Sequence, residues 1–395
     1  MRFPVLALNS GSSSIKFSVF EASGAQPEKL FEGAVEGIGG KSRFWIKDGE
    51  GTKLKDESLK LDDLAGAFGL IAKALEGPPF PRPAAIGHRM VSGGPNITEN
   101  QRLSTELIDE MKRCAPFAPL HIPAAIYIMR EAMKLFDGVP NFVCLDNCFH
   151  RDLPEVTRRL PVPMEYAEMG VRRYGAHGLS YESIVAALEP HVPSRLIVAH
   201  LGNGASIAAI CNGKSVDTSM GLTPEGGLIS GTRTGDIDPG ALIFLLRTIS
   251  EKESDASKAA DVLEKTISKQ SGLLGLSGQS NDMRILREVI GRGNEAAALA
   301  VKEFVYVLRK YIGAYIAVLG GLDMLVFTGG IGEHDVATRA ETCAGLESMG
   351  IILDGERNTK GEGTISAANS RVAVRVIPAE EDLTIVRHVH RMMGT

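Results

Sequence analysis

The segment Val5-Leu-Ala-Leu-Asn-Ser-Gly-Ser-Ser-Ser-Ile15 reads as an apolar strand, a glycine-serine turn and the start of a second strand. A later segment, Leu196-Ile-Val-Ala-His-Leu-Gly-Asn-Gly-Ala-Ser-Ile207, has the same order of features, and its Ser206-Ile207 matches Ser14-Ile15. Each second strand then reaches a turn, and the later one contains Asn212-Gly213, a strong hairpin signal. Two unrelated hairpins can match by chance, but we favour an ancient duplication that produced two similar domains with a boundary near residue 150.

The composition of the whole chain fits a large globular protein. Its 395 residues are 44% hydrophobic and 23% charged, which allows a sizeable core and two or three domains. The 44 glycines exceed the usual share of about 7%, but they follow no G-x-y period, and this excludes a collagen-like chain. The formal net charge of −5 and the lack of a basic block argue against nucleic-acid binding, because phosphate neutralisation needs clustered lysine and arginine.

Apolar runs and amphipathic stretches alternate along the chain, and this alternation predicts an α/β architecture. The predicted strands span residues 5–8, 15–20, 141–145, 196–199, 206–210 and 324–327. The predicted helices span residues 62–76, 105–114, 123–136, 239–249 and 294–319. The most membrane-like stretch, residues 311–327, contains Gly320, Gly321 and Asp323, so we interpret it as a helix end, a turn and a strand, and expect no membrane span.

The amino terminus and the cysteines both favour a cytoplasmic protein. Residues 1–10 lack the apolar run and the cleavage site of a signal peptide. The five cysteines include no C-x-x-C pair, which favours a reducing compartment over a disulfide framework. Cys144, Asp146, Cys148 and His150 alternate as metal ligands on one strand face would, but we favour the simpler interpretation that the chain leaves a buried strand here.

Three glycine loops each follow an apolar strand, at residues 9–14, 200–204 and 328–333. Glycine lets backbone N–H groups approach and converge on an anion, so the three loops together indicate a nucleotide with several phosphates. The usual nucleotide motifs fail, because a P-loop ending at Gly213-Lys-Ser215 needs glycine where Ala208 stands, and a dinucleotide fingerprint starting at Gly202 meets Ile207. The chain also has no G-x-S-x-G elbow and no H-E-x-x-H pair, which leaves a phosphate-binding fold of another type.

Three charged or titratable side chains lie close to glycines on both sides, namely Arg89, His177 and Arg233. Small neighbours give a bulky ligand access to such a side chain, and an arginine fork binds carboxylates and transferring phosphoryl groups. A surface arginine and a structural histidine are the competing interpretations, and for His177 the two are evenly balanced.

At these residues the sequence resembles the acetokinase family, and the resemblance covers nearly the whole chain. The motifs that carry it are Leu8-Asn-Ser-Gly-Ser-Ser-Ser-Ile-Lys-Phe17, Gly87-His-Arg-Met-Val91, Ala118-Pro-Leu-His121, Asp146 with Phe149-His150, Arg172-Arg-Tyr-Gly-Ala-His-Gly178, His200-Leu-Gly-Asn-Gly-Ala-Ser206, Val216-Asp-Thr-Ser-Met-Gly-Leu-Thr-Pro224, Gly231-Thr-Arg-Thr-Gly-Asp-Ile-Asp-Pro239, Ser271-Gly-Leu-Leu-Gly275 and Phe327-Thr-Gly-Gly-Ile-Gly-Glu333.

The resemblance implies an α/β fold of two duplicated ribonuclease-H-like (actin-like ATPase) domains around a central cleft. Residues 1–150 with a carboxy-terminal helix at about 382–395 would form one domain, and residues 151–381 the nucleotide-binding domain. The implied activity is that of an acetate kinase, with reversible in-line transfer of the γ-phosphoryl group from ATP to acetate, giving acetyl phosphate and ADP. The family requires Mg²⁺, for which Mn²⁺ is an expected substitute, and its members are cytoplasmic homodimers.

The resemblance also assigns roles to individual residues. Asn9 and Glu381 would hold Mg²⁺, Arg89 would hold the substrate carboxylate, His177 and Arg233 would stabilise the transition state, and Asp146 would be an acid/base or positioning carboxylate. The implied substrate pocket contains Val91, Leu120, His121 and Pro224. The implied nucleotide contacts are Ser14, Lys16, His200, Leu201, Gly202, Asn203, Gly204, Asp282, Met283, Arg284, Gly330, Ile331, Gly332, Glu333 and His334.

The chemistry of the reaction fits these roles independently. A short carboxylic acid has a pKa near that of glutamic acid, about 4.3, so it is already ionised at neutral pH and needs no general base. The difficulty is to bring one anion against another, and positive charge with accurate positioning overcomes it. We therefore interpret Asp146 as a residue that orients a cationic side chain or a metal-bound water.

Several positions depart from the common family pattern without removing a proposed catalytic group. These are Ser92, Leu179, Tyr181, Gly226, Gln270, His334 and Glu380. Ala176 stands where part of the family has phenylalanine, so the acyl pocket is expected to be roomier and propionate is a second candidate substrate. Two other classes stay open on the same fold, a non-transferring ATPase that acts as a conformational switch and a sugar or polyol kinase.

Overall fold

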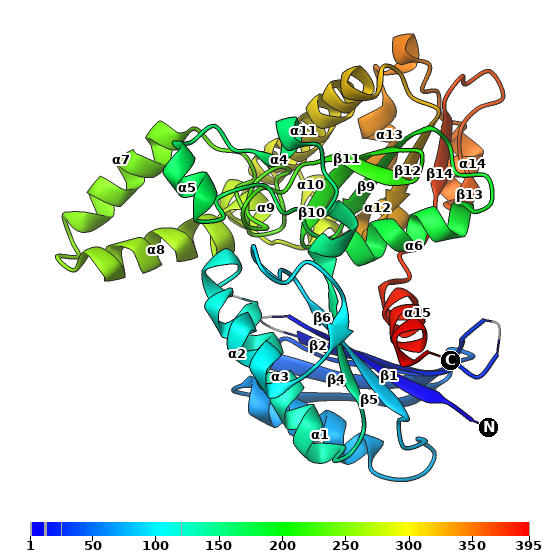
Figure 1. The fold of residues 1–395 in the computed structure, drawn as a ribbon. Coiled ribbons are helices and arrows are strands. Elements are labelled where there is room, and N and C mark those ends of the chain that lie inside the picture. Colours follow the sequence, from blue (N-terminus) through cyan, green and yellow to red (C-terminus); the bar gives the residue numbers. More distant parts are fainter. Residues whose placement is uncertain (1, 12–13, 25, 120, 395) are drawn as a thin grey trace. The chain divides into compact units, whose positions relative to one another are not determined.

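The computed structural model describes residues 2–11, 14–24, 26–119 and 121–394 (Figure 1). The chain divides into two compact units. The first comprises Met1–Arg151, Gly178–Ser183 and Glu380–Thr395, and the second comprises Asp152–His177 and Ile184–Ala379.

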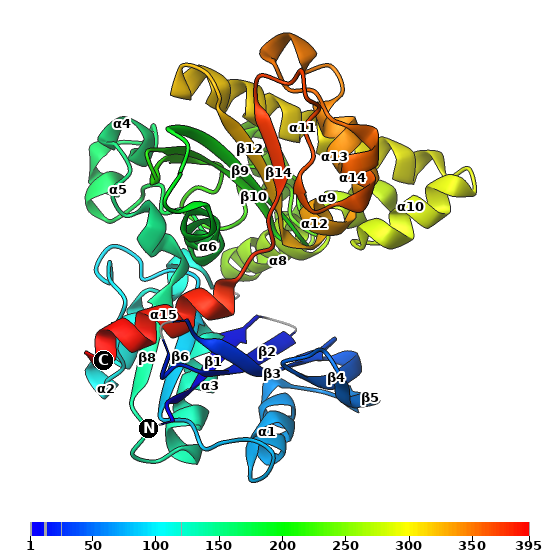
Figure 2. The same ribbon diagram turned by 90° about the vertical axis from the view of Figure 1, so that its right-hand side faces the viewer.

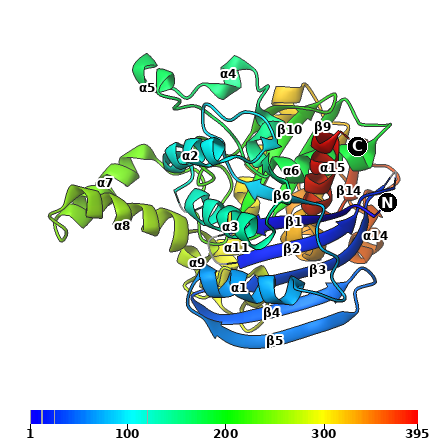
Figure 3. The ribbon, with the colours of Figure 1, turned by 60° about the horizontal axis from the view of Figure 1, so that its bottom comes forward.

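The first unit is built on a mixed sheet with the strand order β5-β4-β3-β2-β1-β6-β8-β7. The strands are β1 (Pro4–Ser10), β2 (Ser14–Glu21), β3 (Glu28–Glu36), β4 (Gly40–Asp48), β5 (Lys53–Leu61), β6 (Ala85–Met90), β7 (Gln101–Arg102) and β8 (Asn141–Leu145). Strand β1 is antiparallel to β2 and parallel to β6, and β6 is parallel to β8. Figure 3 shows β1 to β5 side by side in this sheet.

Helices cover both faces of this sheet because side chains alternate along β1. Leu6 and Leu8 belong to the core cluster that includes residues of α1 (Leu64–Leu75) and α3 (Ile122–Leu135). Val5 and Ala7 belong to the cluster on the other face, with α15 (Glu381–Met393), the helix drawn in red beside β1 in Figure 2. The unit also contains α2 (Thr105–Arg113) and 3₁₀ turns at Ala115–Phe117 and Asp146–His150.

The second unit has its own mixed sheet, with the strand order β11-β10-β9-β12-β14-β13. The strands are β9 (Arg195–Leu201), β10 (Ala205–Cys211), β11 (Lys214–Thr218), β12 (Met324–Thr328), β13 (Gly363–Thr364) and β14 (Ala373–Val376). Strand β9 is antiparallel to β10 and parallel to β12, and β12 is parallel to β14.

The long helix α11 (Glu295–Leu319) packs on the second sheet, where Phe304 and Leu308 join Ile197 and Ile207 in one buried cluster. Helix α6 (Gly178–Leu188) contributes its first six residues to the first unit. The other elements are α4 (Glu155–Arg158), α5 (Met164–Glu168), α7 (Pro239–Ser250), α8 (Ala256–Lys269), α9 (Gly272–Ser277), α10 (Met283–Gly291), α12 (Gly329–His334), α13 (Val336–Cys343), α14 (Gly355–Lys360) and a 3₁₀ turn at Glu347–Met349.

The two sheets have the same five-strand core. In the first unit the order is β3-β2-β1-β6-β8, in the second it is β11-β10-β9-β12-β14, and the parallel and antiparallel pairings correspond strand by strand. The repeat seen between residues 5–15 and 196–207 is therefore the equivalent first hairpin of each unit. This repeated core confirms the predicted duplicated actin-like fold.

The predicted strands and helices are all present, with shifts of one or two residues at their ends. One glycine loop differs, because residues 329–334 form the short helix α12. Strand β8 ends at Leu145 and a 3₁₀ turn follows, so Asp146, Cys148 and His150 do not alternate on a strand face. Within the described residues no helix has the length and apolar character that a membrane span requires.

Candidate functional site

The polar cluster of the first unit lies where three neighbouring strands end. Asn9 is near the end of β1, Arg89 is near the end of β6, and Asp146 directly follows β8. Since β1, β6 and β8 run parallel, their carboxyl ends meet at the same edge of the sheet. Glu381 joins them as the first residue of α15.

Arg89 is the centre of this cluster. Its Nη2 donates to Asp146 Oδ2 at 2.6 Å and its Nε donates to both carboxylate oxygens, at 3.1 and 3.0 Å. Its Nη1 donates to Asn9 Oδ1 at 2.9 Å and lies 3.8 Å from Glu381 Oε2. Asn9 in turn donates to Glu381 Oε2 at 3.2 Å, so the four side chains form one connected network.

Arg89 and Asp146 form an ion pair that is largely shielded from solvent. The Asp146 side chain is 0% exposed and the Arg89 side chain is 18% exposed. Burial alone would lower the pKa of Arg89, but the nearby Asp146 and Glu381 carboxylates outweigh it and hold that pKa above its usual value. A carboxylate held this closely by an arginine is suited to orient the guanidinium and poorly suited to accept another proton.

The start of α15 is held against β2 by a second carboxylate. Ser18 Oγ donates to Asp382 Oδ2 at 2.5 Å, which fixes the residue next to Glu381. Burial raises the pKa of Asp382, although the bond from Ser18 opposes this shift. The contact gives Glu381 a defined position beside Asn9.

Asn9 and Glu381 fit a magnesium ion in chemistry. They place one amide group and one carboxylate within hydrogen-bond distance, and such oxygens are the protein ligands that Mg²⁺ prefers. Magnesium in phosphoryl-transfer sites binds to one or two protein groups and otherwise to water and substrate phosphates. Within the described part of the chain there is no group of three or more His, Cys, Asp or Glu residues that could hold a metal ion.

The remaining predicted residues of the first unit lie on β2, after β6 and before α3. Lys16 pairs with Asn9 across β1 and β2, so the two side chains lie on the same face of the sheet, and Ser14 begins β2. Val91 follows β6 and packs against a buried cluster, and His121 precedes α3. Leu120 lies outside the described residues.

His177 has an unusual backbone in the second unit. It precedes α6 with φ +57°, a left-handed conformation that residues other than glycine rarely adopt. Its Nδ1 lies 2.8 Å from the buried Ser206 Oγ, and its ring stacks on His200 with 4.2 Å between centroids. The bond at Nδ1 fixes the orientation of the ring and leaves Nε2 on its opposite side.

Gly204 lies beside His177 and Arg233, the two residues of the second unit that are predicted to stabilise the transition state. A Cβ at this glycine would lie 3.3 Å from His177 Nε2 and 3.3 Å from Arg233 Nη1. The absence of a side chain therefore lets both groups approach the turn between β9 and β10. Gly231 N donates to Asn203 O at 2.8 Å, which holds the loop of Arg233 against the same turn.

A cavity of about 650 Å³ opens in the second unit beside this turn. Eight of the predicted nucleotide residues line it, namely Gly202, Asn203, Asp282, Met283, Arg284, Gly330, Ile331 and His334. Its size is that of a small-molecule site. Its walls come from the β9–β10 turn, α10 and α12.

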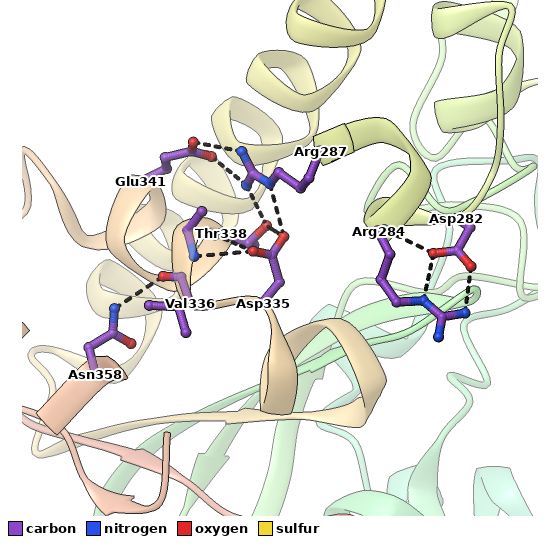
Figure 4. A network of polar contacts seen from close by, with 9 residues as sticks. Asp282, Arg284, Arg287, Asp335, Val336, Thr338, Glu341 and Asn358 are labelled. Atoms are coloured by element: carbon purple, nitrogen blue, oxygen red, sulfur yellow. Dashed lines mark hydrogen bonds and ion pairs between the residues drawn. The ribbon is translucent and has the colours of Figure 1, made fainter. Parts of the chain in front are cut away.

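An ion-pair network supports one wall of this cavity (Figure 4). Arg287 on α10 donates to Asp335 Oδ2 at 3.1 Å, to Thr338 Oγ1 at 3.0 Å and to Glu341 at 2.8 Å. Asp335 also accepts from two backbone N–H groups at the start of α13. The network joins α10 to α13 and so holds α10, one wall of the cavity, in place.

Other predicted nucleotide residues do not line the cavity. Leu201 is buried in the core, and Gly332 is a buried residue of α12 that faces Phe327 and Ala199. The Glu333 carboxylate accepts from Gly329 N at 2.9 Å and from Ala379 N at 3.1 Å, so it is engaged by backbone rather than directed into the cavity.

Sequence reasoning missed four residues that the structure places at the site. Asn281, Arg287 and Asp335 line the cavity, and Ser206 contacts His177. Asn281 directly precedes the Asp282 motif, and Ser206 matches Ser14 in the repeat, so both had a usable signal. Arg287 and Asp335 are 48 residues apart, and nothing in the sequence indicated that they lie together.

Comparisons with known proteins identify the family of this chain. The sequence profile of the Acetokinase family matches residues 4–387. Acetate kinase 1 of Neisseria meningitidis serogroup B is 39% identical over 401 residues, covering 99% of this chain and 98% of that protein. The crystal structure of Porphyromonas gingivalis acetate kinase has a TM-score of 0.84 and 37% identity, covering 99% of this chain and all of that one. A propionate kinase structure from Francisella tularensis subsp. tularensis has a TM-score of 0.88 and 33% identity, with the same coverage.

The duplicated fold and the family match together identify a phosphotransferase. The chain belongs to the acetokinase family, and it is an enzyme of the acetate kinase type that phosphorylates short-chain carboxylates.

Proposed function

We propose that the protein is an acetate kinase that transfers the γ-phosphoryl group of ATP to acetate, reversibly and in line. The observation that carries this proposal is Arg89, a guanidinium fixed by Asp146 and Asn9 at the carboxyl edge of the first sheet. Such a fork suits a carboxylate acceptor that is already ionised. A sugar hydroxyl would instead need a base to remove its proton.

The proposed acceptor contacts belong to the first unit. Arg89 binds the acetate carboxylate, and Asp146 holds the guanidinium in position without taking a proton. Val91, two residues after Arg89, is proposed to contact the substrate methyl group. Asn9 and Glu381 would hold Mg²⁺, which supplies positive charge that offsets the phosphate oxygens.

The proposed donor contacts belong to the second unit. ADP or ATP occupies the cavity lined by Gly330 and Met283. His177 and Arg233 place positive charge and hydrogen-bond donors on the side of Gly204, where they stabilise the charge of the transferring phosphoryl group. Ser206 keeps the His177 ring turned so that Nε2 faces that side.

Hydroxylamine trapping tests the transfer step directly. The protein with ATP, Mg²⁺ and acetate is expected to form acetyl hydroxamate in proportion to ADP. ADP release without hydroxamate would instead indicate a non-transferring ATPase, and ADP release that depends on glucose or glycerol would indicate a sugar or polyol kinase.

Acetate is proposed as the preferred acceptor, with propionate as a weaker one. Ala176 is buried and stands where part of the family has phenylalanine, and the similarity to a propionate kinase also supports a roomier pocket. One extra methylene in a hydrophobic pocket changes kcat/KM by about 10- to 200-fold. We expect kcat/KM for acetate to exceed that for propionate, and an equal or higher value for propionate would overturn the assignment.

Gly330→Ala is expected to raise the KM for ATP by about tenfold. Apart from its own helix, a Cβ at Gly330 meets no atom of the described chain within 4 Å, and the residue lines the cavity, so the methyl group is expected to enter it. The melting temperature should not fall, because alanine favours helix more than glycine does. Gly355→Ala, at another open helical position outside the cavity, is the control, and an unchanged KM for ATP in Gly330→Ala would place the nucleotide elsewhere.

We propose a cytoplasmic homodimer in which a second copy covers α7. This helix has the sequence Pro-Gly-Ala-Leu-Ile-Phe-Leu-Leu-Arg-Thr-Ile-Ser, yet none of its residues is buried, and Phe244 is 70% exposed. An apolar helix left uncovered in this way indicates a protein interface. Sedimentation at several concentrations reads the oligomeric state, and a monomer at every concentration would contradict this proposal.

A further inference from the structure

Arg233 lies beside a carboxylate that no motif assigns. Glu225 Oε2 is 3.7 Å from Arg233 Nε, and the two side chains are 19% and 18% exposed. The Oε2 atom is buried and has no hydrogen-bond partner among the described residues. The ion pair with Arg233 is therefore the main interaction that compensates this buried oxygen.

Fold stability does not account for a carboxylate in this position. A buried polar atom without a hydrogen bond lowers the stability of the fold, and the cost is larger when the atom is charged. Burial raises the pKa of Glu225, Arg233 lowers it, and the Glu264 carboxylate on α8 raises it further. A neutral side chain of the same shape would cost less to bury, so the charge needs another explanation.

The geometry around Arg233 supplies that explanation. Its Nε faces Glu225, and its Nη1 donates to Pro224 O at 3.3 Å. The same Nη1 faces Gly204, the residue that His177 Nε2 also approaches. Two consecutive residues, Pro224 and Glu225, thus hold the guanidinium while its Nη1 lies on the side of the His177 ring.

We propose that Glu225 is a positioning residue that holds the Arg233 guanidinium in the orientation needed for phosphoryl transfer. This inference rests on the proposed role of Arg233 in the reaction. Glu225 acts through Arg233 and contacts no substrate. A guanidinium fixed in advance avoids reorganisation when the charge of the phosphoryl group develops.

The charge of Glu225 makes this positioning dependent on pH. Above its raised pKa the residue is a carboxylate and pairs with Arg233, and as the pH falls through that pKa it becomes neutral and the pair is lost. Arg233 stays charged throughout, because an arginine side chain is not deprotonated in proteins. The charged groups that act on Glu225 are Arg233 on the 231–236 loop and Glu264 on α8. We therefore expect an acid-side decline in kcat that originates from Glu225.

Glu225→Gln tests the proposal, because it keeps the shape of the side chain and removes its charge. We expect kcat to fall about tenfold, the KM for ATP to stay within twofold, and the acid-side decline in kcat to disappear. The melting temperature should stay the same or rise, since a purely structural role would lower it together with activity. Glu225→Asp keeps the charge on a shorter side chain, and we expect an intermediate kcat with the acid-side decline retained.

Two further variants separate this inference from the proposed function. Glu264→Gln, on the neighbouring helix, is the control and should leave kcat within twofold. If Arg233→Ala abolishes turnover while Glu225→Gln keeps wild-type kcat and pH dependence, the positioning role is wrong and the proposed function stands. If Arg233→Ala retains wild-type kcat, the proposed role of Arg233 fails, and the inference fails with it.

Discussion

Arg89→Gln is expected to reduce turnover by about 10³-fold and to lower the free energy of unfolding of the first unit by about 3–5 kcal/mol. The activity falls because the acceptor carboxylate loses its guanidinium, and an arginine that stabilises phosphoryl transfer contributes about 10³- to 10⁵-fold. The stability falls because Asp146, which is 0% exposed, loses the cation that compensates its charge. Steady-state kinetics and denaturant unfolding measure the two effects separately.

A double variant separates the effect of Arg89 on turnover from its effect on the free energy of unfolding. In Arg89→Gln/Asp146→Asn both partners are neutral, so we expect most of the stability to return while turnover stays low. Arg82→Gln, which removes an exposed arginine of the same unit, should change neither property. A double variant as unstable as Arg89→Gln would show that the ion pair is not the source of the loss, and near-normal turnover in Arg89→Gln would exclude Arg89 as the acceptor-binding residue.

Gly204→Ala is expected to reduce kcat by about 10- to 100-fold with little change in the KM for ATP. The added methyl group would lie 3.3 Å from both His177 Nε2 and Arg233 Nη1, which is closer than a Cβ normally approaches such atoms. Both side chains must withdraw by a few tenths of an ångström, and displacements of about 1 Å in a catalytic site cost about 10²-fold. Initial-rate kinetics at saturating and limiting ATP measure kcat and KM.

Gly313→Ala is the matched control for this substitution. Gly313 lies inside α11, where a Cβ meets no other atom of the described chain within 4 Å apart from the helix itself. Alanine there should preserve kcat and raise the free energy of unfolding by about 0.5–1 kcal/mol, as expected within a helix. Wild-type kcat in Gly204→Ala would show that His177 and Arg233 do not act from the positions described.

The parts of the fold that sequence reasoning predicted correctly are those where the local pattern determines the structure. Strand β8 is buried at all five residues, and its last four, Phe142-Val-Cys-Leu145, appear in the sequence as an apolar run. Strand β5, in contrast, consists of Lys53-Leu-Lys-Asp-Glu-Ser-Leu-Lys-Leu61 and is mostly exposed at the sheet edge. Its pairing with β4, rather than its own apolar side chains, determines its structure, so periodicity alone missed it.

The short helix α12 shows a different limit. Three glycines within residues 329–334 predict a loop, but tertiary hydrogen bonds stabilise a helix there. Glu333 accepts from Gly329 N, and the buried Arg339 donates to Gly332 O and Glu333 O. The bonds from Arg339 come from outside the motif and have no signature within it.

The candidate site likewise contains residues that the sequence predicted and residues that it did not predict. Arg89, His177 and Arg233 stood out because glycines surround them in the sequence. The residues that hold the latter two were not predicted. Ser206 is 29 positions from His177, and Glu225 lies between Pro224, where the quoted motif ends, and the departure at Gly226. Local composition thus points to the groups proposed to face a ligand, while the residues that orient them depend on tertiary packing.

Helix α15 has a consequence for the order in which the protein is made. Its Ile385, Val386 and Val389 complete the core on one face of the first sheet, and Glu381 completes the polar cluster at the sheet edge. The ribosome synthesises this helix after the whole of the second unit. Domains usually fold during synthesis from the amino terminus onward, but here we expect the second unit to be able to fold first, while the earlier-made first unit waits for its last helix.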